Sequence, residues 1–219
     1  DLTNQEIVAV LDDAERLVPV ARGDVYLPLL QGKVLANMFF ENSTRTRMSF
    51  ETAMKRLGGS VLNFTSIGTS VAKGETLYDT MQMIDGYADV AAIRHPRQGA
   101  AQYSADAVEI PILNAGDGAG NHPTQTMLDL FTIRQAHGTL EGLNVVLVGD
   151  LRYGRTVHSL SHALVRFGAK LTLVSPSTLK MPVEIVSDLR EYGSEIMEIE
   201  SLEDQIAGAD VIYVTRIQK

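Results

Sequence analysis

The most constraining feature of this chain is an alternation, along most of its length, of short apolar runs with longer stretches of helical periodicity. Asn144 to Val148 is one such apolar run, residues 156–167 have the helical pattern, and Leu171 to Val174 is the next apolar run. Strands separated by helices are not joined as tight hairpins, so they pair in parallel and the helices cover the faces of the sheet. The sequence therefore predicts an α/β fold.

The alternation forms two series of strands and helices. A helix that starts at Asn121-His122-Pro123 and stops at Gly138 separates them, because proline favours the first helical position and glycine ends helices. We therefore expect two similar domains, residues 1–138 and 139–219, each with a mostly parallel sheet flanked by helices. The expected strands are 34–40, 60–64, 90–94, 112–114, 144–148, 171–174, 195–198 and 211–215, and the expected helices are 4–20, 46–57, 75–87, 99–107, 123–135, 156–167, 183–192 and 202–207.

The two series resemble each other at the ends of their strands. Arg45 and Arg155 each follow the first strand of a series at the start of a helix, and Arg94 and Arg216 lie at the ends of later strands. Open α/β sheets bind ligands at the carboxyl ends of their strands. The similarity has two explanations. Either two related domains each bind one anionic substrate, or similar sequence segments arise in any α/β architecture.

Composition excludes several classes of function. The chain has 219 residues, a mean hydropathy of +0.02 and no apolar run of about 18 to 20 residues, so we expect a soluble protein without a membrane span, located in the cytoplasm. The absence of cysteine excludes disulfides, thiolate metal ligands and a cysteine nucleophile. A net charge of −8 disfavours nucleic acid as a partner. Arginines at strand ends in such an acidic chain indicate local pockets for small anions.

The segment Ser43-Thr44-Arg45-Thr46-Arg47 predicts a phosphate site. It follows an apolar strand and opens a helix, where unbonded backbone N–H groups and the positive end of the helix dipole favour an anion. The guanidinium of Arg45 can add two hydrogen bonds to the oxygens of that anion. The alternative is an ordinary helix cap, with Ser43 or Thr44 at the N-cap and solvated arginines on the first turn.

The segment Gly149 to Thr156 has the glycine spacing of a nucleotide-binding P-loop. The lysine of that motif is replaced by Arg155, and no later strand clearly ends in the aspartate that would hold magnesium, so the segment does not predict a nucleoside triphosphate site. Arg155 at a helix start is suited to a carboxylate. The alternative is a strand-to-helix turn with an exposed arginine.

Two further segments are candidates for ligand contacts. His122 starts a helix and Gln125 follows one turn later, so the two side chains can converge on one ligand, where imidazole and amide groups suit a carbonyl; a capping histidine is the alternative. The polar segment 66–75 is either a mobile surface loop or a lid. As a lid it would bring Lys73 to a phosphate group, including one in a neighbouring subunit.

Taken in order, these motifs resemble the catalytic chain of the aspartate carbamoyltransferase family over essentially the whole sequence. Thr124 and the loop containing Tyr153 are typical of the branch that uses aspartate, since an ornithine enzyme typically has cysteine at the position of Thr124. The segments that carry the resemblance are Ser43 to Arg47, Thr69-Ser70, Lys73 to Glu75, Arg94 to Pro96, His122 to Gln125, Asp150 to Leu160 and Thr215 to Gln218.

The resemblance implies transfer of the carbamoyl group of carbamoyl phosphate to the amino group of L-aspartate, in pyrimidine biosynthesis. It assigns residues 1–138 to the carbamoyl-phosphate-binding domain and 139–219 to an incomplete aspartate-binding domain, with no cofactor and no metal. It also implies a homotrimer with shared active sites and, in some relatives, regulatory chains. The implied catalytic residues are Arg45, Thr46, Arg94 and His122, and the implied substrate-binding residues are Ser43, Thr44, Ser70, Lys73, Gln125, Arg155, Arg216 and Gln218.

The resemblance is incomplete in two respects. The family sequence continues past the position of Lys219 to a His-Pro-Leu-Pro segment and a final helix, so we expect a chain truncated at its C-terminus. Some relatives also carry two adjacent lysines where this chain has only Lys73. Two alternatives therefore stay open: a transcarbamoylase with another acceptor such as ornithine, and a non-catalytic subunit that binds carbamoyl phosphate.

Overall fold

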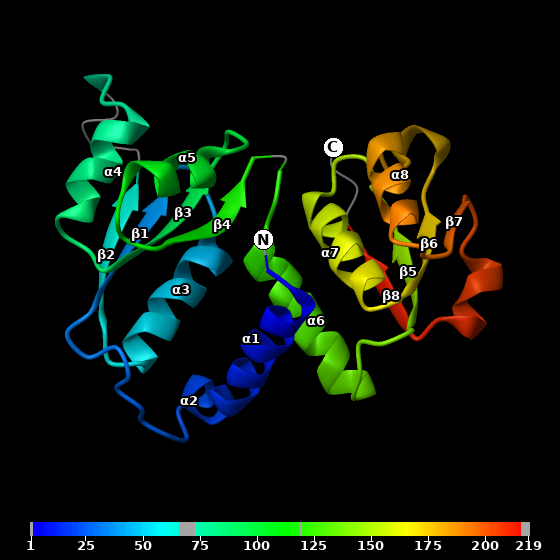
Figure 1. Ribbon diagram of the computed structural model, residues 1–219, viewed down its shortest axis with the longest axis horizontal. Coiled ribbons are helices and arrows are strands. Elements are labelled where there is room, and N and C mark those ends of the chain that lie inside the picture. Colours follow the sequence, from blue (N-terminus) through cyan, green and yellow to red (C-terminus); the bar gives the residue numbers. More distant parts are fainter. Residues whose placement is uncertain (1, 66–72, 119, 216–219) are drawn as a thin grey trace. The chain divides into compact units, whose positions relative to one another are not determined.

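The computed structural model describes residues 2–65, 73–118 and 120–215, and it contains two parallel four-stranded sheets flanked by helices (Figure 1). The predicted α/β class is confirmed. The chain forms two compact units, one of residues Asp13–His122 and the other of Asp1–Asp12 together with Pro123–Lys219, and each contains one sheet. The domain boundary after residue 138 stays a prediction.

The unit Asp13–His122 is built on the strand order β2-β1-β3-β4, with all neighbours parallel. Side chains alternate across this sheet: Ala36 and Met38 of β1 belong to one apolar cluster with α4 and α5, whereas Leu35 packs on the other face with Met54 of α3. The elements are α2 (Val18–Arg22), β1 (Val34–Phe39), α3 (Thr44–Arg56), β2 (Ser60–Thr65), α4 (Leu77–Asp85), β3 (Val90–His95), α5 (Ala100–Ala107) and β4 (Ile112–Asp117).

The other unit has the strand order β7-β6-β5-β8, again all parallel. Val145 and Leu147 of the central strand β5 share one apolar cluster with Leu130 of α6, Leu164 of α7 and Leu189 of α8. The elements are α6 (Pro123–His137), β5 (Asn144–Val148), α7 (Arg155–Arg166), β6 (Lys170–Val174), η2 (Ser177–Leu179), α8 (Val183–Glu191), β7 (Ile196–Ile199), η3 (Glu203–Gly208) and β8 (Val211–Val214). The first helix, α1 (Asn4–Arg16), contributes Ile7 and Leu11 to the same cluster.

The similarity between the two series of strands has a structural counterpart. Asp89, just before β3, accepts a hydrogen bond from the backbone N–H of Val34 at 2.8 Å, and Asp210, just before β8, accepts one from Asn144 at 2.8 Å. Both aspartates thus tie a later strand to the first strand of its sheet at the amino end. The sheets differ beyond these central pairs, because β4 extends one edge in the first unit and β7 extends the other edge in the second.

Two predicted helices were wrong in detail. The single helix expected over residues 4–20 is divided into α1 and α2, because Pro19, near the start of α2, has no N–H to continue the hydrogen-bond ladder of α1. The segment predicted as a helix at 202–207 is a 3-10 helix, η3. Such short segments gain too few hydrogen bonds to favour the α form strongly.

No helix within the described parts of the chain is long and apolar enough to cross a membrane.

Replacing Leu164 by alanine should destabilise the unit that contains β5. Its side chain is fully buried in the apolar cluster of α6, α7 and α8, so truncation leaves a cavity and should lower the free energy of unfolding by about 2 to 5 kcal/mol. Denaturant unfolding measures the change. Leu128→Ala is the matched control, because this leucine is 59% exposed and its truncation should cost less than about 0.5 kcal/mol. Equal losses in both variants would contradict the assigned core.

Candidate functional site

The first turn of α3 presents backbone donors at the carboxyl end of β1. Ser43 occupies the N-cap position with an extended backbone, and its side chain makes no capping hydrogen bond. Thr44, Arg45 and Thr46 form the first turn, where backbone N–H groups have no acceptor within the helix. An ordinary side-chain cap therefore does not account for Ser43, and the turn has the arrangement of an anion site.

A buried amide fastens this turn to the sheet. Asn37 on β1 is fully buried, and its Nδ2 donates to the carbonyl oxygen of Arg47 at 3.0 Å and to Oδ1 of Asn63 on β2 at 3.3 Å. Asn63 in turn donates to Glu51 Oε2 at 3.0 Å. Side chains from two strands thus hold α3 in place, so its first turn has a defined position above the strand ends.

Arg94 and His122 meet at the end of the neighbouring strand. Arg94, on β3, places Nη1 3.3 Å from Nε2 of His122 and donates to the carbonyl oxygen of Ala115 at 3.2 Å. Its Nε lies 2.6 Å from Glu41 Oε1, in an ion pair whose arginine side chain is only 12% exposed. Because a guanidinium only donates, Nε2 of His122 is the acceptor, which corresponds to a neutral imidazole protonated at Nδ1.

The loop before His122 is shaped by Asp117 and Gly116. The buried carboxylate of Asp117 accepts hydrogen bonds from the backbone N–H groups of Asn121 at 2.6 Å and Gly99 at 3.0 Å. Gly116 has a φ of +121°, and a Cβ built there would lie 3.1 Å from Arg94 Nη1 and 3.5 Å from His122 Cδ2. This glycine therefore leaves the space in which the arginine and the histidine meet.

His95 packs beside this site and favours its neutral form. Its ring lies 5.0 Å from that of Phe40, and its Nδ1 accepts the backbone N–H of Arg97 at 3.0 Å. Burial, followed by the nearby charge of Arg97, lowers the pKa of His95 below its ordinary value. The residue thus adds little positive charge at neutral pH and serves to pack the end of β3.

In the unit that contains β5, Arg155 is the first residue of α7. Gly149 precedes it with a φ of +119°, and a Cβ there would come within 2.4 Å of the Thr215 carbonyl oxygen, so only glycine lets β5 end beside β8. The fully buried Asp150 accepts the backbone N–H groups of Arg152 and Tyr153 at 3.2 and 3.0 Å. These hydrogen bonds fix the conformation of the loop, and Arg155 lies at the N-terminus of α7, which follows it.

Gln125, on the first turns of α6, is held by an acid one turn later. Its Nε2 donates to Asp129 Oδ1 at 3.0 Å, and Asp129 Oδ2 accepts the hydroxyl of Tyr213 at 3.2 Å. Burial raises the pKa of Asp129, and these two donors oppose that rise. Burial and then the charge of Asp129 raise the pKa of Tyr213, so its hydroxyl keeps its proton.

The predicted site residues are divided between the two units. Within the unit Asp13–His122, Ser43, Thr44, Arg45 and Thr46 share one helix start, and Arg94 at the end of β3 contacts His122 in the loop that follows β4. Gln125 and Arg155 belong to the other unit. Lys73 is exposed in the turn before α4, whereas Ser70, Arg216 and Gln218 lie outside the described residues.

Several acids at these positions were not predicted from the sequence. Glu41 pairs with Arg94, Asp117 shapes the loop before His122, and Asp129 binds Gln125. Glu41 and Asp129 had detectable signals, since one adjoins the phosphate segment and the other is four residues from Gln125 on a helix. Within the described ranges, no group of three or more His, Asp or Glu side chains is placed to hold a metal ion.

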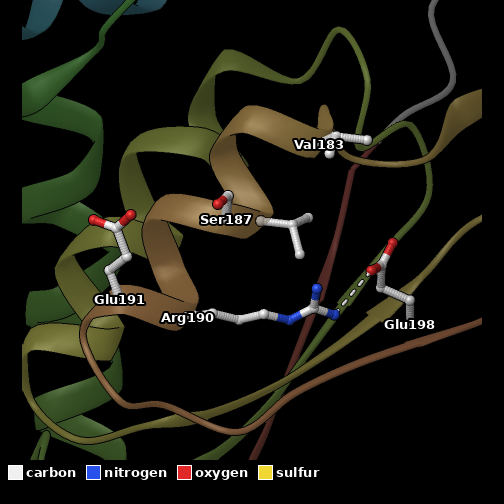
Figure 2. Close-up of a pocket in the computed structure, with 6 residues that line it drawn as sticks. Val183, Ser187, Arg190, Glu191 and Glu198 are labelled. Carbon is white, nitrogen blue, oxygen red and sulfur yellow. Dashed lines mark hydrogen bonds and ion pairs between the residues drawn. The ribbon is translucent and has the colours of Figure 1, made fainter.

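A separate hollow of about 410 Å³ lies between α8 and β7 (Figure 2). Arg190 and Glu198 face each other across it, with Nη2 and Oε1 3.3 Å apart. No predicted site residue is among its lining residues, which are Val183, Val186, Ser187, Arg190, Glu191 and Glu198. The hollow is thus distinct from the strand-end positions described above.

Comparison with known protein families shows matches to two domains of one family. Residues 1–135 match the family model described as aspartate/ornithine carbamoyltransferase, carbamoyl-P binding domain, and residues 141–219 match the Asp/Orn binding domain of the same family. The chain belongs to the aspartate/ornithine carbamoyltransferase family. The predicted family resemblance is confirmed.

Aspartate carbamoyltransferase catalytic subunits are similar to this chain over its full length. It is 54% identical to the aspartate carbamoyltransferase catalytic subunit of Methanothermobacter thermautotrophicus, covering 100% of this chain and 70% of that protein. The solved catalytic subunit of M. jannaschii aspartate transcarbamoylase superposes with a TM-score of 0.95 at 49% identity, over 100% of this chain and 72% of the other.

Aspartate transcarbamoylase from Trypanosoma cruzi has been solved with its ligands. Its complex with carbamoyl phosphate and aspartate superposes on this chain with a TM-score of 0.94 at 43% identity, covering 100% of this chain and 71% of that one. A second complex of the same protein holds carbamoyl aspartate and phosphate. Substrates and products have thus both been seen on a close structural relative.

Replacing Gly116 by alanine should disturb the Arg94–His122 pair. The added Cβ would crowd both side chains at an unfavourable φ, so the free energy of unfolding should fall by about 1 to 3 kcal/mol. The NMR signals of the His122 ring should shift at the same time. Denaturant unfolding and imidazole NMR measure the two effects.

The control for this prediction is Gly138→Ala. Gly138 also has a positive φ, of +76°, but no atom lies within 4 Å of the position that a Cβ would take there, so the change carries a backbone cost of about 1 kcal/mol without side-chain crowding. His122 signals that move equally in the two variants would show that the crowding at Gly116 is not what positions the histidine.

Proposed function

We propose that this chain is the catalytic chain of an aspartate carbamoyltransferase. It would transfer the carbamoyl group of carbamoyl phosphate to L-aspartate, giving N-carbamoyl-L-aspartate and phosphate, in de novo pyrimidine biosynthesis. The observation that carries the proposal is the pairing of an anion-binding helix start at the end of β1 with the Arg94–His122 pair at the end of β3. The relatives named above support aspartate as the acceptor.

The phosphate group would bind at the first turn of α3. Backbone N–H groups and the helix dipole favour its charge, and Ser43, Thr44, Arg45 and Thr46 supply hydroxyls and a guanidinium within one turn. Arg45 is exposed, so it is accessible to a ligand from solution. A small, highly charged substrate is thereby fixed at one end, which leaves its carbonyl carbon in a defined position.

The carbonyl oxygen would be polarised by Thr46, Arg94 and His122. Arg94 is already oriented by Glu41, and a neutral His122 keeps one N–H donor, so both side chains can donate to one oxygen. Their hydrogen bonds strengthen as negative charge develops on that oxygen during attack. The loss of one such donor typically costs about 3 to 4 kcal/mol of transition-state stabilisation.

The acceptor would be held by residues of the other unit. Gln125 would contact the carbamoyl NH2 group, and Arg155, Arg216 and Gln218 would bind the two carboxylates of aspartate. The amine nitrogen then forms the new bond to the carbonyl carbon while the bond to the phosphate oxygen breaks. The amine proton passes to the departing phosphate, so the reaction needs no covalent enzyme intermediate and no cofactor.

Assembly follows from the same proposal. Ser70 and Lys73 would reach the phosphate of an adjacent subunit, which makes the active unit a homotrimer with shared sites. Association with regulatory chains and a cytoplasmic location remain predictions from the family resemblance.

Arg45→Ala should reduce turnover by about 100-fold to 1,000-fold without unfolding the protein, because it removes the guanidinium from the phosphate end of the site. Steady-state assays of phosphate and carbamoyl-product release measure the loss, with L-aspartate and L-ornithine supplied in parallel. Arg56→Ala, an exposed arginine at the other end of α3, is the control and should change kcat by less than about two-fold.

The acceptors separate the alternatives. Wild-type turnover with aspartate alone agrees with the proposal, whereas turnover with ornithine alone overturns the acceptor and keeps the phosphate site. Tight binding of carbamoyl phosphate without turnover would favour a non-catalytic binding subunit. Near-normal activity of Arg45→Ala would remove Arg45 from the site.

Mixing inactive Lys73→Ala and Arg94→Ala proteins should restore part of the activity. If Lys73 acts in the neighbouring subunit, a hybrid trimer contains some sites in which both residues are intact. Activity is measured after the two variants are dissociated, mixed and reassembled, and each variant reassembled alone is the control. Mixed trimers that stay as inactive as the parents would argue against shared sites.

A further inference from the structure

Asp129 and Tyr213 form a hydrogen-bonded chain that ends on Gln125. Gln125 Nε2 donates to Asp129 Oδ1 at 3.0 Å, and the Tyr213 hydroxyl donates to Oδ2 at 3.2 Å. The three residues come from α6 and β8, and all belong to one unit. These hydrogen bonds therefore join the helix that carries Gln125 to strand β8.

The chemistry of Asp129 determines which way the Gln125 amide faces. An ionised carboxylate only accepts hydrogen bonds, so the NH2 group of Gln125, and not its carbonyl oxygen, must face Asp129. The Oε1 atom of Gln125 is thereby turned away from Asp129. An oriented amide oxygen is a fixed acceptor for an N–H donor of a ligand.

We propose that Asp129 is a positioning residue that holds the amide of Gln125 so that its carbonyl oxygen accepts a hydrogen bond from the carbamoyl NH2 of the substrate, and that Tyr213 holds Asp129 in turn. This inference rests on the proposed function. Carbamoyl phosphate offers donors only at its NH2 group, so an acceptor at this point orients the carbamoyl plane. Asp129 itself touches no substrate and acts through Gln125.

Partial burial gives the arrangement its rigidity. Asp129, Gln125 and Tyr213 are all half-buried, and the tyrosine ring packs against the apolar cluster beneath β5. A hydrogen bond to a charged group is stronger in such surroundings than in water, and each carboxylate oxygen has one protein donor. A simple i,i+4 pair on an exposed helix lacks the second donor and the contact with a strand.

The test is a double-mutant cycle in the full-length protein, assayed with carbamoyl phosphate and L-aspartate. Asp129→Ala should lower kcat by about 10-fold to 100-fold, because a misplaced amide no longer orients the reacting group. In a Gln125→Ala background the same substitution should change kcat by less than about two-fold, since the group through which it acts is gone. The KM for aspartate should change less than kcat.

Asp106→Ala is the matched control. Asp106 accepts Gln102 Nε2 at 2.8 Å in an exposed i,i+4 pair on α5, so its removal breaks the same kind of bond where no site residue is involved. Its kcat should equal that of the wild type. Tyr213→Phe keeps the ring and removes the hydroxyl, and it should give a smaller loss that also disappears in the Gln125→Ala background. If Asp129→Ala fails to fold, Tyr213→Phe is used to test the inference in its place.

The outcomes are separable. A wild-type protein with no turnover contradicts the proposed function, and the role of Asp129 falls with it. If the wild type is active and Asp129→Ala costs the same with or without Gln125, Asp129 is merely structural and the inference is overturned. An undiminished kcat in Asp129→Ala overturns it as well.

Discussion

The parallel pairing of β1 with β3 is the interaction on which the candidate site depends. It places Phe39 beside Arg94 in the register, with the Phe40 N–H bonded to the Arg94 carbonyl oxygen at 2.8 Å. The helix start that follows β1 and the guanidinium on β3 are thereby delivered to the same edge of the sheet. At the opposite end, Asp89 ties the start of β1 to the turn before β3. A shift of the register by one residue would turn Arg94 to the other face, so the position of this cation follows from strand pairing.

Neighbouring groups pair with the charged guanidinium of Arg94 at this edge of the sheet. A nearly buried guanidinium needs partners, and the carboxylate of Glu41, the Ala115 carbonyl and the imidazole of His122 supply them. His95 adds little charge, because burial lowers its pKa. A chain with a net charge of −8 can therefore keep a nearly buried guanidinium at this edge of the sheet. The positions of the strand ends and helix starts, and not the overall composition, decide where the arginines lie.

Much of this could be predicted from sequence, because the signals were local. Strand β5 was predicted with its observed bounds, since an apolar run between a glycine turn and a polar loop is typical of a buried parallel strand. The break between α1 and α2 was missed, although Pro19 was visible, because the pattern of apolar residues continues past it. Likewise, the serine, threonine and arginine segment marked the start of α3, but nothing near Asp117 in the sequence distinguished it from a surface acid.

The sequence by itself determined the α/β class, the family, and the types of group available for a phosphate, a carbonyl and two carboxylates. The class and the group types rest on residues close together in the chain, where periodicity and motif spacing carry the information, and the family rests on the order of the motifs along the whole chain. Only the tertiary structure decided that β3 lies beside β1, that Glu41 pairs with Arg94, and that Asp129 receives both Gln125 and Tyr213. Strand order and burial bring Arg94 to Glu41 and Tyr213 to Asp129, and both depend on packing across the whole unit.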